Sequence, residues 1–324
     1  MQMKIFTTFS LSAVIILASS CQMVRSVGVN ATSGILKESS AEVNTEANYE
    51  FFKKSAAANL KIVEGLWFSQ KENESLLTLL IKGYAGVAFG INETEYLHDQ
   101  LSDNEIEVNK KQALYNYSKS FRYGLEFLKL NDISEDEVFN KEAPIKIRKK
   151  LTSELSSDDR EAVFYFAQAW GGMINLQRDD VAMMANLGTV KALMDWVCDQ
   201  DYEFENGSCY LFDAVYEAGR PRMLGGSLKK GNEIFQKVMK KYPEHLLAKI
   251  TYLQFFVIPT MNEVEFAKVV EGMTLDKSAF EGVKNYSQMN QETERFLNHP
   301  ELNLYNAIAL KRLEIILKNR QDLF

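Results

Sequence analysis

The sequence predicts an all-α protein in which tetratricopeptide-like helical hairpins pack into one compact bundle. Apolar residues recur at helical spacing in five segments of the chain: 51–68, 112–128, 181–197, 234–242 and 304–317. The chain has five prolines, and each can be placed at a helix boundary: positions 144, 221, 243, 259 and 300. No alternating, β-branched segment bounded by hairpin turns occurs, so a β-sheet has no candidate strands.

The N-terminus carries the pattern of a bacterial lipoprotein signal peptide over residues 1–20. A short basic start ending at Lys4 precedes an apolar run, 5–18, that is too short to span a bilayer as a stable helix. Small residues then lead into Cys21, which is predicted to be the lipidated N-terminus of the mature chain. A plain secretory signal is the alternative. Because Gln22 is not the aspartate that commonly retains lipoproteins in the inner membrane, we expect an anchor in the outer membrane, facing the periplasm.

Residues 21–46 are predicted to form a flexible tether, and residues 47–324 a single all-α domain. The tether is rich in Ser, Asn, Val and Glu and has no periodic apolar face, so it cannot bury enough surface to offset its ordering entropy. The domain has an ordinary globular composition, with 46% hydrophobic and 25% charged residues over the whole chain. The net charge of −7 argues against nucleic acid as a partner.

Two segments, 75–91 and 162–176, are apolar nearly all round and are predicted to lie in the middle of the bundle. The first is a little short for a membrane span and contains Lys82, which favours a core helix.

The stretch 210–243 predicts two helices joined by a sharp turn. Pro221 cannot continue the first helix, Gly225 or Gly226 is expected at positive φ, and Ser227 can cap the second helix. The second helix has the small, aromatic, small and proline spacing of the back half of a tetratricopeptide repeat: Gly231, Phe235, Val238 and Pro243.

The run EAGRPRMLGGSLKKGNEIFQKVMKKYP in this stretch resembles the signature of the T-component (TatT-type) family of TRAP transporters, the tripartite ATP-independent periplasmic uptake systems. Further segments match the family in the same order: ANLKIVEGLWFSQ, LLIKGYAGVAFG, YNYSKSFRYGLEFL, AWGGMINLQRDD and NLYNAIALKRLEIILKNRQDLF. The resemblance covers roughly residues 50–324.

The resemblance implies a periplasmic lipoprotein of helical repeats that assembles as a homotrimer with an apolar pore in each protomer. It also implies association with the substrate-binding P component of a TRAP transporter and the transfer of a hydrophobic ligand. The two all-round apolar helices supply the candidate pore-lining residues: Leu79, Tyr84, Phe89, Phe164, Phe166 and Trp170. Packed core is the alternative for each of them.

Five residues of the turn are candidates for a structural role or for contact with a partner: Arg220, Pro221, Arg222, Gly225 and Gly226. The two arginines can bond helix C-terminal carbonyls or contact the partner directly. Cys198 and Cys209 bracket a polar stretch between two apolar helices, and an oxidising periplasm permits a disulfide there. Two unpaired cysteines are the alternative.

The sequence shows no catalytic motif, so the protein is predicted not to be an enzyme and to need no cofactor or metal. His98, His245 and His299 have no companion at metal-ligand spacing, and no nucleophile elbow, P-loop or HExxH helix is present. A generic tetratricopeptide scaffold lipoprotein of the outer membrane, of the assembly-factor kind, is the first alternative function. An enzyme that uses dispersed carboxylates is the second.

Overall fold

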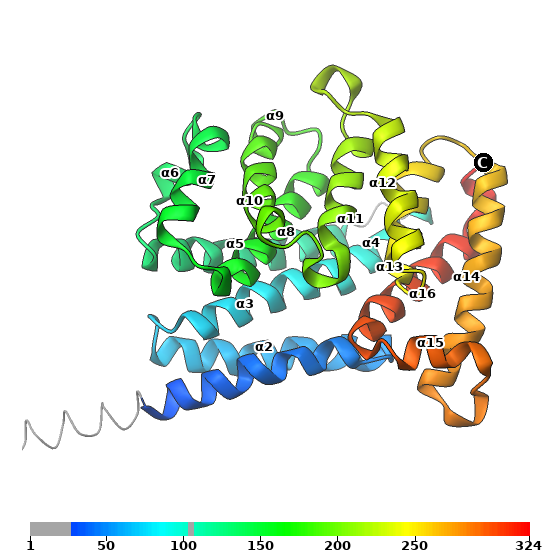
Figure 1. The fold of residues 1–324 in the computed structure, drawn as a ribbon, viewed down its shortest axis with the longest axis horizontal. Coiled ribbons are helices and arrows are strands. Elements are labelled where there is room, and N and C mark those ends of the chain that lie inside the picture. The colour runs from blue at the N-terminus through cyan, green and yellow to red at the C-terminus, as the bar shows by residue number, and fades with distance from the viewer. Residues whose placement is uncertain (1–26, 103–106) are drawn as a thin grey trace, which may run out of the picture.

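The computed structural model describes residues 27–102 and 107–324 and confirms the all-α prediction (Figure 1). No strand occurs among the described residues. The first part of the chain forms these α-helices: α2 (Tyr49–Ser69), α3 (Glu74–Val87), α4 (Glu93–Leu101), α5 (Val108–Leu130), α6 (Glu135–Phe139), α7 (Ala143–Glu154), α8 (Arg160–Leu176), α9 (Val181–Met184) and α10 (Leu187–Gln200).

The second part of the chain packs beside the first and ends in a long buried helix. Its α-helices are α11 (Phe204–Gly219), α12 (Leu228–Lys241), α13 (Leu246–Tyr252), α14 (Glu263–Lys284), α15 (Glu294–Leu297) and α16 (Asn303–Lys318). Two π-helical turns directly follow α3 and α13: η2 (Ala88–Asn92) and η5 (Leu253–Val257). The 3-10 turns are η1 (Ser40–Thr45), η3 (Ser157–Asp159), η4 (Arg222–Leu224), η6 (Tyr286–Gln288), η7 (Gln291–Thr293), η8 (Pro300–Leu302) and η9 (Arg320–Asp322).

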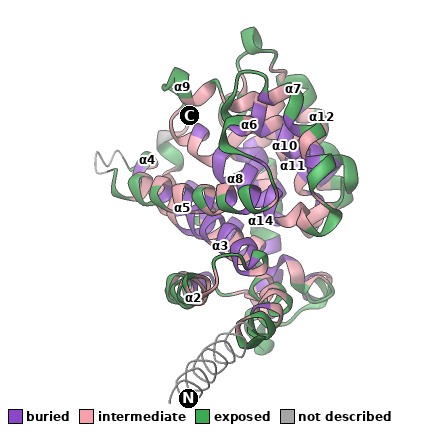
Figure 2. Cartoon of the chain, turned by 90° about the vertical axis from the view of Figure 1, so that its left-hand side faces the viewer, coloured by how far each residue is buried: buried purple, intermediate pink, exposed green. Residues whose placement is uncertain are grey.

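Helix α3 lies between two hydrophobic cores, which explains why its sequence is apolar nearly all round. One face packs into the first core, formed mainly with α5, α8 and α10, and the other packs into a second core with α2, α13 and α16. The residues of α3 divide as follows: Leu77, Ile81 and Ala85 in the first core, Leu80, Tyr84 and Val87 in the second. Figure 2 shows α3 and α8 largely buried in the middle of the molecule. Their predicted central position is confirmed.

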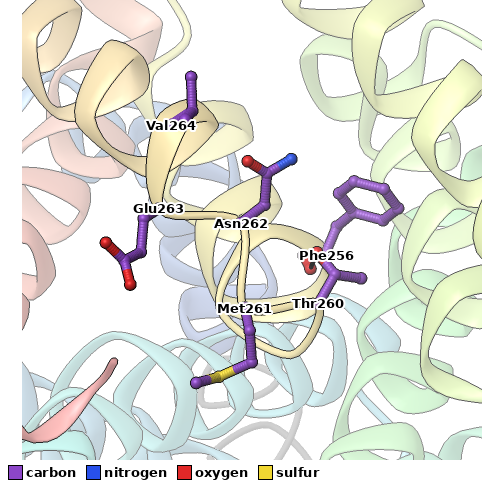
Figure 3. Close-up of a pocket in the computed structure, with 6 residues that line it drawn as sticks. All are labelled: Phe256, Thr260, Met261, Asn262, Glu263 and Val264. Carbon is purple, nitrogen blue, oxygen red and sulfur yellow. Dashed lines mark hydrogen bonds between the residues drawn. The ribbon is translucent and has the colours of Figure 1, made fainter.

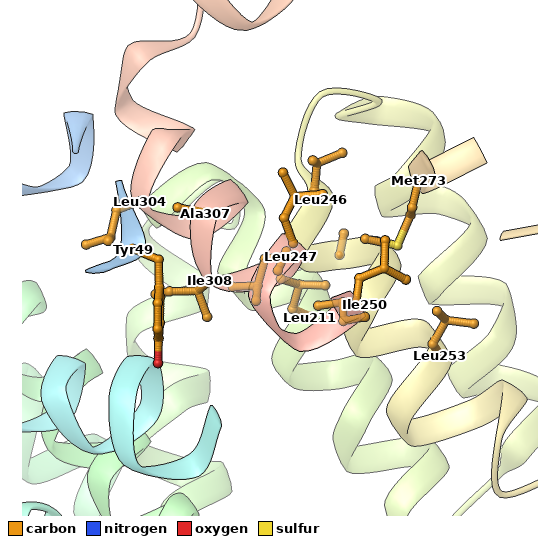
Figure 4. Close-up of a cluster of buried hydrophobic side chains, with 14 of the residues drawn as sticks. Tyr49, Leu211, Leu246, Leu247, Ile250, Leu253, Met273, Leu304, Ala307 and Ile308 are labelled. Atoms are coloured by element: carbon orange, nitrogen blue, oxygen red, sulfur yellow. The ribbon is translucent and has the colours of Figure 1, made fainter. Parts of the chain in front are cut away.

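The second core joins the N-terminal helices to the C-terminal ones (Figure 4). Tyr49 at the start of α2 packs with Leu304 and Ile308 of α16, while Leu246 and Ile250 of α13 pack on the other side of that helix. Contacts between residues so distant in sequence hold both ends of the described chain in one bundle.

Helices α11 and α12 form the hairpin that the sequence predicts. Phe235 and Val238 are fully buried, and a Cβ on Gly231 would lie 2.8 Å from the Cβ of Ala218, so glycine lets the two helices approach closely. The hairpin has the packing expected of a repeat unit. The repeat character of the remaining helices stays a prediction.

Residues 27–45, within the segment predicted to be a flexible tether, are helical in the structure. Asn73 Nδ2 donates hydrogen bonds to Asn30 Oδ1 and Ser33 Oγ, each at 2.9 Å, and Ser33 is buried. The prediction of flexibility is therefore corrected for this part, because polar side chains fasten it to the domain in place of an apolar face. Residues 1–26 lie outside the described residues.

One helical stretch of the described chain, Glu74–Leu101, is long and apolar enough to cross a membrane by length and composition. However, 61% of its apolar 18-residue window is buried inside the protein. This burial is that of a core helix, as the sequence favoured.

Candidate functional site

The RPRMLGGS connector between α11 and α12 folds into a closed turn built around η4. The Gly226 amide donates to the Pro221 carbonyl at 3.2 Å, and the Ser227 amide donates to the Glu217 carbonyl at 2.8 Å. The Ser227 hydroxyl then accepts from the Lys230 amide at 3.3 Å and caps α12. Most of the connector's backbone polar groups are therefore satisfied within the turn.

Arg220 lies at the centre of this turn and holds it together. Its Nε donates to the Tyr216 carbonyl at 3.0 Å, Nη1 to the Leu224 carbonyl at 2.9 Å and Nη2 to the Gly225 carbonyl at 3.2 Å. The guanidinium also stacks 3.8 Å above the Tyr216 ring. Arg220 thus satisfies carbonyls at the helix end, whereas Arg222 is exposed.

The two glycines of the connector serve different purposes. Gly225 has φ +85°, the left-handed conformation that the sequence predicts for one of the pair. Gly226 has no positive φ, but a Cβ there would lie 1.9 Å from the Arg220 carbonyl oxygen. Gly225 permits the reversal of the chain and Gly226 permits its closure.

Cys198 and Cys209 are joined by a disulfide in the structure, with their Cα atoms 5.8 Å apart. Between them Glu205, Asn206 and Gly207 have φ of 48°, 56° and 82°, three consecutive residues in the left-handed region. Such a conformation is costly for Glu205 and persists only where surrounding contacts hold it.

Glu205 is held by contacts to both halves of the bundle. Its Oε2 accepts a hydrogen bond from the Tyr305 hydroxyl of α16 at 2.9 Å, and its Oε1 lies 3.7 Å from Lys82 Nζ of α3. Lys82 pairs more closely with Glu161 of α8, at 2.7 Å. The Tyr305 hydroxyl also lies 3.5 Å from that of Tyr165, and burial raises the pKa of both phenols well above 10. These side chains form the first polar centre.

His245 packs beside the first polar centre, with its ring centroid 5.7 Å from that of Tyr305. It is 1% exposed, and its Nδ1 has no hydrogen-bond partner among the described residues. Burial without a counter-charge lowers the pKa of His245 from 6.5 to about 4, so the ring is neutral at neutral pH.

A second polar centre surrounds Arg312 of α16, which is 3% exposed. Its Nε donates to Thr94 Oγ1 at 3.0 Å, and its Nη2 donates to the Phe89 carbonyl of η2 at 2.6 Å. Its Nη1 lies 3.4 Å from Gln254 Oε1 of η5. Both π-helical turns therefore present a polar atom to the same guanidinium.

Glu93 balances the charge of Arg312 in the second polar centre. Its Oε2 lies 3.9 Å from Arg312 Nη2, and its Oε1 accepts a hydrogen bond from the Tyr117 hydroxyl at 2.7 Å. Burial raises the pKa of Glu93 above 4.5, although Arg312 and Tyr117 favour the charged form. The centre ties α4, α5 and α16 to the π-helical turns, a structural role that fits its burial.

The six residues predicted to line a pore lie mostly in packed core. Phe166 stacks on Phe121 of α5 and Trp170 packs edge-on against the same ring, each at a centroid distance of 5.0 Å. Phe164 packs edge-on against Phe204 at 5.4 Å. Tyr84 is also buried, stacked on Tyr123, whereas Leu79 and Phe89 are partly exposed. These surroundings are those of a core.

Two hollows in the surface lie away from those six residues. The first, about 510 Å³, is formed by the connection from η5 to α14 (Figure 3): Phe256, Thr260, Met261, Asn262, Glu263 and Val264. The second, about 280 Å³, lies between α2, α14 and α16 and is lined by Lys and Glu side chains around Tyr49. Neither presents a cluster of reactive groups.

The described residues also offer no metal centre. Within them, no group of three or more His, Cys, Asp and Glu side chains could hold an ion. The acidic run Glu135–Glu137 opens α6, where Glu137 and Ser134 form a capping box, so these carboxylates stabilise a helix start. Cys21, the predicted lipidation site, lies outside the described residues.

Comparison with known proteins identifies the family of this fold. Residues 45–324 match the family model of the TRAP transporter T-component, nearly the whole chain. The chain belongs to the TRAP transporter T-component family. The resemblance seen in the sequence is thereby confirmed, and no curated protein matches the chain. As a T-component, the protein is an accessory of a TRAP transporter, and its family is not an enzyme family.

The sequence of this T-component predicted the connector but neither of the two polar centres. Glu93 lies two residues after the apolar segment 75–91, and Arg312 lies inside the apolar run 304–317. A charged residue embedded in an apolar helix is the signal that could have pointed to a buried pair. Their partnership could not be found, because more than 200 residues separate them in the sequence.

Proposed function

We propose that this T-component is a periplasmic lipoprotein that binds the substrate-binding P component of a TRAP transporter. The family match over residues 45–324 carries the proposal, since a transporter accessory acts through the other components. The lipoprotein pattern that ends at Cys21 supports a lipid anchor, and Gln22 favours the outer membrane. Assembly as a homotrimer is part of the proposal and rests on the family resemblance.

Transfer of a hydrophobic ligand is the second part of the proposal. Leu79 and Phe89 are partly exposed and could contact such a ligand. Phe164, Phe166 and Trp170 are buried among other aromatic rings, which supports packing in place of a pore. Lipophilic molecules that copurify with the folded protein would support the transfer role.

A generic tetratricopeptide scaffold for outer-membrane assembly is the second candidate. The close helical hairpin of α11 and α12 favours it, because stacked hairpins build protein-binding surfaces. The two candidates differ in the partner that they require.

A pull-down from native membranes tests the proposal, with mass spectrometry of both proteins and lipophilic small molecules. The P component should be enriched together with the T-component. Enrichment of outer-membrane assembly factors in its place would favour the scaffold.

The membrane anchor is tested by Cys21→Ala. This variant should move from the membrane fraction to the soluble periplasm, because a stable anchor requires more than one acyl chain and the variant would carry none. Unchanged partitioning would contradict lipidation at Cys21.

A further inference from the structure

The connector between α11 and α12 turns the Arg220 guanidinium inward and its apolar side chains outward. The Arg220 guanidinium is bound to three carbonyls inside the turn. Met223 is 96% exposed, Leu224 56% and Leu228 36%. We call these three side chains the apolar tip. This distribution is the reverse of the usual one, since exposed turns normally carry polar residues.

The apolar tip is displayed by a rigid turn. The Leu224 and Gly225 carbonyls accept from Arg220, and Gly226 is closed against the Arg220 backbone. A side chain held by a fixed backbone loses less conformational entropy when a partner covers it. The turn is therefore preorganised for contact at Met223.

The segment that carries the apolar tip is strongly basic, although the whole chain is acidic. Residues 220–241 contain seven Lys and Arg and one Glu, a net charge of +6, whereas the chain carries −7. The exposed basic residues of this segment are Arg222, Lys229, Lys230, Lys237, Lys240 and Lys241. Lys229 and Lys241 form ion pairs, with Glu233 and Glu203. The other four form no ion pair with a described residue, so their charge is free to act on a partner.

The tip projects from one end of the molecule. In Figure 1 the yellow-green connector stands beyond the ends of α11 and α12, while the first described residues lie at the opposite, lower end. Figure 2 shows the same separation from the side. An anchor at the N-terminal end would leave the tip facing away from the membrane that holds the protein.

We propose that the apolar tip and the basic outer face of α12 form the surface on which the P component docks. The partner would present an apolar pocket for Met223 and Leu224, surrounded by acidic side chains that face α12. This inference rests on the proposed function, because it names the surface for the partner proposed there. Apolar anchors at the centre of an interface supply most of its affinity, and surrounding charges supply the association rate and orientation.

The test measures calorimetric binding of the purified P component to the full-length protein in detergent. The double variant Met223→Glu/Leu224→Glu should weaken the Kd at least tenfold. Val264→Glu is the matched control, because Val264 is 82% exposed on α14 and should leave the Kd unchanged.

A second pair of variants tests the charges. Lys230→Glu/Lys237→Glu should weaken binding and reduce its dependence on salt concentration, since exposed charges are screened by ions. Lys54→Glu/Lys149→Glu makes the same change of charge at exposed lysines of α2 and α7 and should leave binding unchanged. Equal thermal unfolding curves for all variants would show that the fold is intact.

The outcomes separate the docking surface from the proposed function. If the wild-type protein binds the P component and the tip variants bind it equally tightly, the docking surface is wrong and the proposed function stands. No binding of wild-type protein overturns both. Tip-dependent binding to phosphatidylglycerol vesicles without binding to the P component assigns the tip to a membrane, and a tip-dependent change in oligomeric mass assigns it to a second copy. Either result overturns the proposal.

Discussion

Two sharp connections lie at the ends of α11: residues 199–208, which include the kinked start of that helix, and the connector to α12. Different interactions hold them. The first contains Glu205, Asn206 and Gly207 at positive φ inside a loop closed by a disulfide. The second has no covalent closure and is held by the Arg220 guanidinium and by the close approach at Gly226. The first directs a carboxylate into the protein, and the second directs apolar side chains into solvent.

This difference gives the first connection a structural role, and we propose a binding role for the second. Consecutive left-handed residues cost free energy. At the first connection the disulfide and the contacts of Glu205 offset this cost, and those contacts join the connection to the protein interior. At the second connection the polar groups are already satisfied inside the turn. Exposure of the Met223 and Leu224 side chains therefore does not stabilise the fold, which is why we propose that a partner covers them.

Loss of the disulfide should have the largest effect on stability. Cys198→Ala/Cys209→Ala should lower the free energy of unfolding by about 3 kcal/mol, because the bond restrains a loop with a sequence separation of 11 in the unfolded chain. Urea denaturation measures the change, and reductant should produce a similar loss in the wild type. Two reactive thiols in unreduced, denatured protein carrying Cys21→Ala would show that the bond is absent.

Acid should lower the free energy of unfolding through His245, which packs beside Tyr305, the hydrogen-bond partner of Glu205 in the first connection. The pKa of His245 is about 4 when folded and 6.5 in the unfolded chain, so protonation favours unfolding. The stabilisation is present above pH 6.5 and is lost as the pH falls toward 4, by about 2–3 kcal/mol.

Comparison of the wild type with His245→Leu isolates this loss. The cost of the altered packing is the same at pH 7.5 and pH 4.5 and cancels, so only the wild type should show the additional acid sensitivity. Equal pH dependence in the two proteins would contradict a neutral, buried His245.

Gly226→Ala should damage the second connection by about 1–3 kcal/mol, because the added Cβ would lie 1.9 Å from the Arg220 carbonyl oxygen. Gly219→Ala in the same hairpin is the matched control, since a Cβ there has no neighbour within 4 Å. Thermal unfolding should show a lower Tm for the first variant alone. Equal Tm values would mean that the turn closes differently.

Tyr305→Phe should have the smallest effect, about 1–2 kcal/mol, because it removes the hydrogen bond to Glu205 and leaves the aromatic packing in place. Tyr286, which is 86% exposed, gives the control Tyr286→Phe with no expected change. Chemical denaturation of both variants measures the difference. An unchanged stability for Tyr305→Phe would mean that Glu205 is held by other contacts.

The sequence predicted the elements whose signals are local. The hairpin of α11 and α12, its Ser227 cap and the positive φ at Gly225 follow from nearby residues and were found. Apolar residues recur at helical spacing throughout 181–197, but the chain forms α9 and α10 with a break at Ala185 and Asn186. Periodicity continues across such a break, so it cannot reveal the break.

Features that depend on distant partners could not be predicted. Glu205 meets Tyr305 across 100 residues and Arg312 meets Thr94 across 218, and nothing in either local sequence encodes the other. The family resemblance implied a pore, and the apolar helices 75–91 and 162–176 supplied its candidate lining residues, because composition alone does not distinguish a cavity from a core. Only the three-dimensional structure shows that Phe166 and Trp170 pack with Phe121.

Hydrogen–deuterium exchange of the full-length protein, with and without the P component, tests most directly that the two connections have different roles. We predict slower exchange on binding in residues 222–241, which carry the apolar tip and the basic face of α12, and no change in residues 199–208. Slower exchange in 199–208 with none in 222–241 would contradict the account.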